Sequence, residues 1–119
     1  MKRGEIWWAD LGAYRPLEQT GRRPVVIWQS ETLTRVLQSV LVVPLTTNLK
    51  RANLAGTAVI AASQGGLPED SVALAFQMRA IPKSVLQSRI CALNAAELAE
   101  LELATDEALG RVEPAEPPA

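Results

Sequence analysis

An almost continuously apolar run, "SVLVVPLTT" at residues 39–47, most constrains what this chain can fold into. The run is rich in β-branched residues, which favour strands, and an unbroken apolar strand is typical of one that is buried on both faces. Looser runs of the same kind recur along the chain, separated by segments that contain glycine and proline. We expect these runs to form further strands at 5–11, 24–30, 56–62, 71–81 and 85–93, with a short helix at "PKSVL", residues 82–86, as the alternative for the start of the last run.

The last predicted element has a different pattern, "NAAELAELELATDEALGRV" at residues 94–112. Asn94 is a favourable N-cap, and Glu97 three positions later completes a capping-box arrangement. Gly110 and Pro114 mark the end of the element. Apolar residues recur at helical spacing, namely Leu98, Leu101, Ala104, Ala108 and Val112. We therefore predict a mostly β (α+β) fold, a small SH3-like antiparallel β-barrel with a C-terminal helix.

The length of 119 residues is that of one domain. We assign it to residues 1–112 and expect residues 113–119, "EPAEPPA", to be a disordered proline-rich tail. No apolar stretch reaches the ~18 residues of a membrane span, and the start lacks the apolar region of a signal peptide. A single cysteine, Cys91, excludes an internal disulfide. We expect a soluble cytoplasmic protein that does not contact a membrane.

Residue usage restricts the chemistry that this chain can perform. There are no histidines and one cysteine, so the usual zinc ligands are missing and we expect neither a metal nor another cofactor. The net charge is −1, but residues 1–60 carry eight basic and four acidic side chains, whereas residues 61–119 carry four basic and nine acidic ones. This asymmetry permits a basic face for a polyanion. It also fits an acidic half that contains a solvated helix.

Two arginines stand directly before a strand in "EQTGRRPVVIWQS", residues 18–30. Residues 12–23 are expected to form a loop, and Pro24 is tolerated as the first residue of the strand that follows. The start of a rigid strand holds Arg22 and Arg23 more firmly than a loop would. Arginines in such a place are commonly only solvated, so the pair needs further support before it indicates a function.

That support comes from the order and spacing of several motifs between residues 3 and 93. They are "RGEIWWADL", "EQTGRRPVV", "VVPLTTNL", "GLPEDSVALAFQMRAI" and "KSVL". Together they resemble the MazF/PemK (Kid) family, mRNA interferase toxins of type II toxin–antitoxin systems. The resemblance implies an SH3-like barrel, a homodimer, and metal-independent endoribonuclease cleavage of single-stranded RNA (mRNA) at short sequences. It also implies a cognate MazE-like antitoxin whose extended segment occupies the RNA groove.

The resemblance places functional roles on particular residues of this chain. The catalytic arginine of the family falls on Arg23, its threonine partner on Thr46, and a glutamate associated with activity on Glu18. If 71–81 is one strand, Gln77 and Arg79 lie on the same face of it. The expected RNA-binding residues are Gln19, Gly21, Arg22, Pro24, Thr47, Asn48, Gln77 and Arg79.

One position departs from the family pattern. Many relatives carry an acid directly before the glutamine that corresponds to Gln77, and in some it is the proposed general base. Here that position is Phe76, so this chain cannot use it. Glu18 is the best remaining candidate for the base. Burial would raise the pKa of Glu18 and the two arginines would lower it, and the sequence does not decide between these effects.

RNA supplies its own nucleophile, the 2′-OH, so cleavage by attack on the adjacent phosphorus needs neither water nor metal. The planar guanidinium of Arg23 can bind a phosphate bidentately and stays charged at any working pH. Such a preorganised donor typically contributes ~3–4 kcal/mol to transition-state stabilisation. The hydroxyl of Thr46 can bond a phosphate oxygen or the 2′-OH. Thr47 would face the other side of a regular strand.

Two other functions fit parts of the sequence. A gyrase poison like CcdB shares the expected fold but acts through the C-terminal end of its helix, including a Trp, whereas this chain ends in "EPAEPPA" without an aromatic residue. A non-catalytic RNA- or peptide-binding SH3-like module would explain Phe76 in place of the acid. The arginine loop favours RNA over gyrase as the target, and the RNA-binding module differs from the endoribonuclease in predicting binding without a cleavage product.

Overall fold

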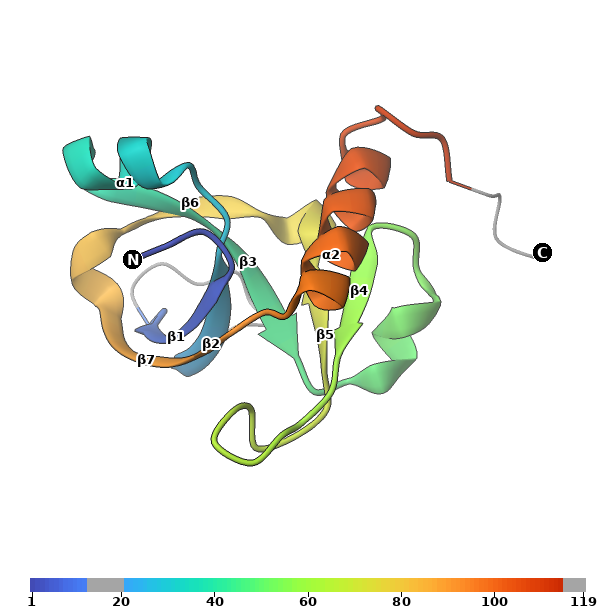
Figure 1. Cartoon of the computed structure of the whole chain (residues 1–119), viewed down its shortest axis with the longest axis horizontal. Helices are drawn as coiled ribbons and strands as arrows, with labels where there is room; N and C mark the ends of the chain where they lie inside the picture. Colours follow the sequence, from blue (N-terminus) through green and yellow to red (C-terminus); the bar gives the residue numbers. More distant parts are fainter. Residues whose placement is uncertain (13–20, 115–119) are drawn as a thin grey trace.

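The described part of the chain forms one sheet of seven strands, in the order β4-β5-β3-β2-β1-β7, with β6 paired to β3 (Figure 1). The computed structural model describes residues 1–12 and 21–114. Every strand pairing in this part is antiparallel. The strands are β1 (Glu5–Asp10), β2 (Arg22–Ile27), β3 (Ser39–Thr46), β4 (Thr57–Ile60), β5 (Ser71–Leu74), β6 (Arg79–Pro82) and β7 (Leu86–Ala92).

The predicted fold class is confirmed, but the sheet is not closed into a barrel. Among the described residues, no ladder joins β4 to β7, the two ends of the strand order. The reason lies in β3, which pairs with β6 along its first half and with β5 at its end. The sheet therefore divides at β3.

The single strand predicted over 71–81 is wrong. A 3-10 helix at Ala75–Gln77 separates β5 from β6. It is held by the backbone N–H of Ala75, which donates to Gly56 O at 2.9 Å, and by that of Met78, which donates to Ala75 O at 3.1 Å. Gln77 therefore lies in this turn while Arg79 begins the next strand, so the two do not alternate along one strand.

The start of β2 and the shorter helices also differ from expectation. β2 begins at Arg22 and not at Pro24, because both arginines already pair with β1. The sequence did not predict helix α1 (Glu31–Val36) or a 3-10 helix at Leu49–Asn53. Both are too short for helical periodicity to distinguish them from loops.

The C-terminal helix α2 (Ala95–Ala108) is confirmed together with its capping box. The Asn94 side chain accepts from the backbone N–H of Glu97 at 2.8 Å, and the Glu97 carboxylate accepts from that of Asn94 at 3.0 Å. Leu101 and Ala104 are buried, and the helix packs along β4. Val112 lies beyond the helix end, because α2 ends at Ala108.

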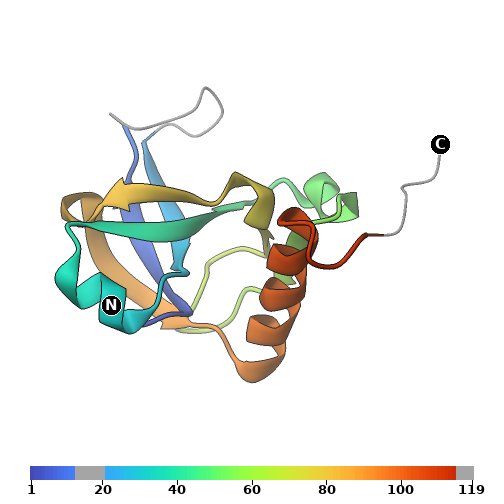
Figure 2. The ribbon, with the colours of Figure 1, turned by 90° about the horizontal axis from the view of Figure 1, so that it is seen from above.

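Two hydrophobic clusters fill the two sides of β2 and β3. One includes Val26, Val43 and Leu45 and extends to Leu101 of α2; the other includes Val25, Ile27, Val40 and Val42. The expected burial on both faces is thus confirmed for 42–45, where four successive residues of β3 are buried. It does not extend to Thr47, which is exposed. Helices α1 and α2 lie at opposite ends of the molecule (Figures 1 and 2). Within the described residues, no helix has the length and apolar character needed to cross a membrane.

Candidate functional site

A cleft of about 340 Å³ opens where β1, the start of β2, the end of β3 and the β4–β5 loop come together. Its size is within the range of small-molecule sites. Cationic, apolar and hydroxyl side chains share its walls. The lining residues are Trp8, Arg22, Arg23, Pro24, Thr47, Leu67, Pro68, Glu69 and Ser71.

Strand register brings the arginines to this place. The β1–β2 ladder sets Ala9 opposite Arg23 and continues to the last residue of β1. The β2–β3 ladder runs as far as Val25, which lies opposite Pro44. Continued by two residues, the same register would set Arg23 opposite Thr46, on the same face of the sheet.

Arg22 is held by two contacts of different kinds. Its Nε donates to Gln87 Oε1 at 2.9 Å, and its guanidinium carbon lies 4.2 Å from the centroid of the Trp8 ring. A cation over an indole face is attracted by the ring quadrupole. The exposed Arg22 side chain is therefore oriented before any ligand arrives.

Arg23 is half-buried and lines the same cleft. Arginine side chains provide planar, permanently charged donors for phosphate oxygens, and two arginines line this cleft. The predicted pairing of Arg22 and Arg23 at a rigid strand start is therefore what the structure shows. Their catalytic and RNA-binding roles stay predictions.

The β4–β5 loop contributes another part of the cleft lining and is internally bonded. Leu67 is 2% exposed and belongs to the hydrophobic cluster beneath α2. The Asp70 carboxylate accepts from the backbone N–H of Ala62 at 2.7 Å. The Ser71 hydroxyl donates to the backbone carbonyl of Glu69 at 3.0 Å. Pro68 and Glu69 are thus presented to the cleft by a fixed backbone.

The remaining predicted residues occupy several different places. Thr47, one of the expected RNA-binding residues, lines the cleft with the arginines. The strand does not stay regular there, because β3 ends at Thr46. Thr46 is not among the lining residues, and its Oγ1 accepts from the backbone N–H of Asn48 at 3.2 Å. Gly21 precedes β2 with φ +72°. Glu18 and Gln19 lie outside the described residues.

Gln77 and Arg79 do not line this cleft. Arg79 pairs with Val42 at the edge of the sheet, where burial lowers the pKa of its guanidinium. In the described part of the chain, its buried Nη2 has no hydrogen-bond partner. Phe76 is 43% exposed, with the Arg51 guanidinium carbon 5.9 Å from its ring centroid.

Sequence reasoning missed Trp8 and Glu69 as members of the site. Both belong to motifs that carried the resemblance, "RGEIWWADL" and "GLPEDSVALAFQMRAI". Neither motif contained a signal that the two residues line one cleft. Among the described residues, no group of three or more His, Cys, Asp or Glu side chains is arranged to hold a metal ion.

Residues 2–109 match the family described as PemK-like, MazF-like toxin of type II toxin–antitoxin system. The chain belongs to this family. It is 34% identical over 110 residues to endoribonuclease MazF of Staphylococcus saprophyticus, covering 92% of each chain. The resemblance inferred from the motifs is therefore confirmed.

Solved structures agree with this assignment. The Mycobacterium tuberculosis toxin MazF-mt6 is 28% identical, with a TM-score of 0.74 over 89% of this chain and 96% of that one. An endoribonuclease from a mycobacterial species, solved with its cognate antitoxin, has a TM-score of 0.75 over 96% of this chain and 99% of that one. At 23% identity, the second likeness shows the fold alone.

Proposed function

We propose that this MazF-like toxin is a sequence-specific endoribonuclease that cleaves single-stranded RNA in the cleft at Arg22 and Arg23. The observation that carries the proposal is the convergence of both arginines with Trp8 and Thr47 in one cleft. A curated relative that is 34% identical is named an endoribonuclease. The gyrase-poison and non-catalytic alternatives have no such support from the comparisons.

The reaction follows from the chemistry of RNA and the groups in the cleft. The 2′-oxygen bonds to the adjacent phosphorus, the bond from phosphorus to the 5′-oxygen breaks, and the products are a 2′,3′-cyclic phosphate and a 5′-hydroxyl. A base takes the 2′-OH proton, and the leaving 5′-oxygen gains one. Arg23 stabilises the extra charge on the phosphate oxygens. Guanidinium groups are very weak acids, so Arg23 acts through its charge and not as a proton donor.

Thr46 retains a suitable role in this scheme although it does not line the cleft. Its oxygen accepts from the Asn48 backbone N–H, so its own hydrogen stays available to donate. The continued β2–β3 register would place that hydroxyl opposite Arg23. We assign Thr46 to hold a phosphate oxygen beside Arg23, with Glu18 as the proposed base.

Three further parts of the proposal concern the environment of the toxin. We propose a cytoplasmic homodimer that is neutralised by a cognate MazE-like antitoxin. One structural neighbour was solved with its antitoxin. An acidic, extended segment would complement the two cleft arginines and compete with RNA for them.

The test is cleavage of a long single-stranded RNA in EDTA, with the ends mapped. We expect discrete cuts that leave 2′,3′-cyclic phosphates and that disappear when the nucleotide before the cut is 2′-deoxy. Arg23→Ala should lower the cleavage rate about 10²- to 10³-fold. The half-buried side chain should be removable without unfolding, which circular dichroism checks.

Arg35→Ala is the matched control, since Arg35 is an exposed arginine on α1. It should cleave like the wild type. Intact RNA from folded wild-type protein would favour the binding module and make gyrase the next target to test. An Arg23→Ala variant that cleaves at the wild-type rate would remove Arg23 from the mechanism.

A further inference from the structure

Glu69 is an unusual member of a cleft that contains two arginines. In the described part of the chain it is the only acidic residue among those lining the cleft. Its carboxylate makes no hydrogen bond or ion pair there, and only its backbone carbonyl is bonded, by the Ser71 hydroxyl. Within the described residues, the cleft therefore contains a carboxylate that can accept hydrogen bonds from a ligand, on a residue whose backbone is held in place.

A phosphate is the wrong partner for this side chain. An ionised carboxylate only accepts hydrogen bonds, and it repels phosphate oxygens. Arg22 and Arg23 provide the complementary charge for the RNA backbone in the same cleft. The two kinds of contact are thus divided as in other nucleic-acid sites, where phosphate contacts position the strand and base contacts specify sequence.

The other walls fit a planar base. Trp8, Pro24, Leu67 and Pro68 supply aromatic and apolar surface. The Arg22 guanidinium lies over one face of the Trp8 ring, so the flat surface on which an unpaired base can stack there is the guanidinium itself, while its Nη groups can donate to a phosphate. A base held on this platform can turn its polar edge toward Glu69.

We propose that Glu69 determines base specificity by accepting two hydrogen bonds from a guanine, one from N1–H and one from the N2 amino group. Guanine alone offers two adjacent donors on its Watson–Crick edge. Adenine and cytosine offer one donor beside a ring nitrogen that would face the second carboxylate oxygen. Uracil offers one N–H between two carbonyls. The inference rests on the proposed RNA cleavage, and it specifies which base the cleft takes.

The test compares wild type and Glu69→Gln on a random-sequence RNA library, with every cut mapped. Wild-type cuts should share guanine at one fixed position relative to the scissile bond. In Glu69→Gln this preference should fall about 10- to 100-fold, as for loss of one good base contact. Glu31→Gln, an exposed glutamate on α1, should keep the wild-type preference.

Inosine supplies the second arm, because it lacks only the N2 amino group of guanine. At the selected position it should slow wild-type cleavage about tenfold and leave Glu69→Gln unaffected. An unchanged guanine preference in Glu69→Gln overturns the proposal. So does an equal loss of rate at all sequences, which would make Glu69 a base or a structural residue.

Binding separates this inference from the proposed function. Non-cleavable 2′-O-methyl oligonucleotides carrying guanine, inosine or uracil can be measured by fluorescence anisotropy even if the wild type cuts nothing. A guanine preference that Glu69→Gln loses supports the inference, and its absence in the wild type refutes it. Thermal unfolding checks that Glu69→Gln is folded. Glu69→Asp is a second variant, in which the shorter carboxylate should weaken the guanine preference without loss of charge.

Discussion

Arg22 and Arg23 are neighbours in sequence, but their side chains are held differently. Arg22 is exposed and oriented by Gln87 and Trp8, whereas Arg23 is half-buried at the cleft. A guanidinium fixed in advance loses less conformational entropy when it binds a phosphate. At the scale of single residues, the site is thus partly prepared by contacts among β1, β2 and β7.

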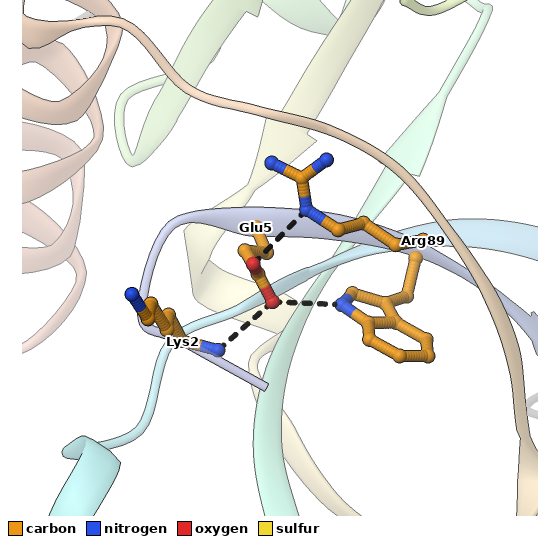
Figure 3. A network of polar contacts seen from close by, with 4 residues as sticks. Lys2, Glu5 and Arg89 are labelled. Carbon is orange, nitrogen blue, oxygen red and sulfur yellow. Dashed lines mark hydrogen bonds and ion pairs between the residues drawn. The ribbon is translucent and has the colours of Figure 1, made fainter.

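Away from the cleft, the Glu5 side chain is likewise held in place by several polar contacts (Figure 3). Its carboxylate accepts from the backbone N–H of Lys2 at 2.9 Å, Trp7 Nε1 at 3.1 Å and Arg89 Nε at 3.0 Å. Burial alone would raise the pKa of Glu5, but these hydrogen bonds outweigh it and hold the pKa below its ordinary value. The group joins the N-terminus, β1 and β7.

Glu5→Gln should lower the free energy of unfolding at pH 7 by about 1 kcal/mol, since hydrogen bonds to a charged acceptor are lost. A carboxyl whose pKa is lower in the folded state stabilises above its unfolded pKa of about 4.3. That stability is lost as the pH falls through the folded pKa. The difference between wild type and variant should therefore shrink from pH 7 to pH 3, as measured by urea unfolding.

Glu31→Gln is the control for this prediction. Glu31 pairs with Arg35 at 3.8 Å on the surface of α1, with both side chains exposed. Such pairs contribute about 0.3–0.5 kcal/mol. A difference between wild type and Glu5→Gln that does not change with pH would contradict the role given to the Glu5 charge.

At the scale of elements, α2 depends both on local capping contacts and on packing against distant strands. The capping box at Asn94 and Glu97 forms within the helix start. Docking depends instead on residues that meet distant strands, such as Leu101, which is 0% exposed. Thr105 adds a polar contact, because its Oγ1 accepts from Trp28 Nε1 at 2.9 Å.

Leu101→Ala should reduce the free energy of unfolding by about 2–5 kcal/mol, because it leaves a cavity in the core beneath α2. Leu103→Ala on the same helix is the matched control. Leu103 is 52% exposed, so its loss should change stability by less than about 0.5 kcal/mol. Chemical denaturation of both variants measures the difference. An equal loss of stability in the two variants would mean that the face of α2 that carries Leu103 is covered in solution.

At the scale of the whole molecule, the net charge is −1, yet the cleft carries two basic side chains and one acidic one. The cleft arginines lie at the start of β2, whereas Arg35 lies on α1, which follows the far end of that strand. An acidic chain can therefore still present a cationic site to RNA. Local charge density, and not net charge, decides this attraction within the short screening length of physiological salt.

The salt dependence of RNA binding measures this directly. For wild type, affinity for a non-cleavable single strand should fall as salt rises, with a log–log slope of about 0.7 per phosphate contacted. Arg22→Ala should reduce the slope by about 0.7, the loss of one such contact. Arg35→Ala should leave it unchanged. An unchanged slope in Arg22→Ala would remove this arginine from the phosphate contacts.

Local patterns determined much of the fold in advance. The capping box defined the start of α2, and the apolar runs identified β1–β4 and β7, because burial imposes the spacing of apolar residues along each element. The position of Arg22 and Arg23 beside a rigid strand was predictable for the same reason. The break at Ala75–Gln77 was not, since it depends on a hydrogen bond to distant Gly56.

Only the tertiary structure decided which residues share the cleft. Trp8, the arginines and Glu69 come from three separate segments, and strand register together with the anchoring of Leu67 sets them in one place. An apolar pattern specifies which side chains are buried, but not which strand edges meet. The sequence thus determined the elements and the arginine pair. Long-range pairing decided the open sheet and the surroundings of those arginines.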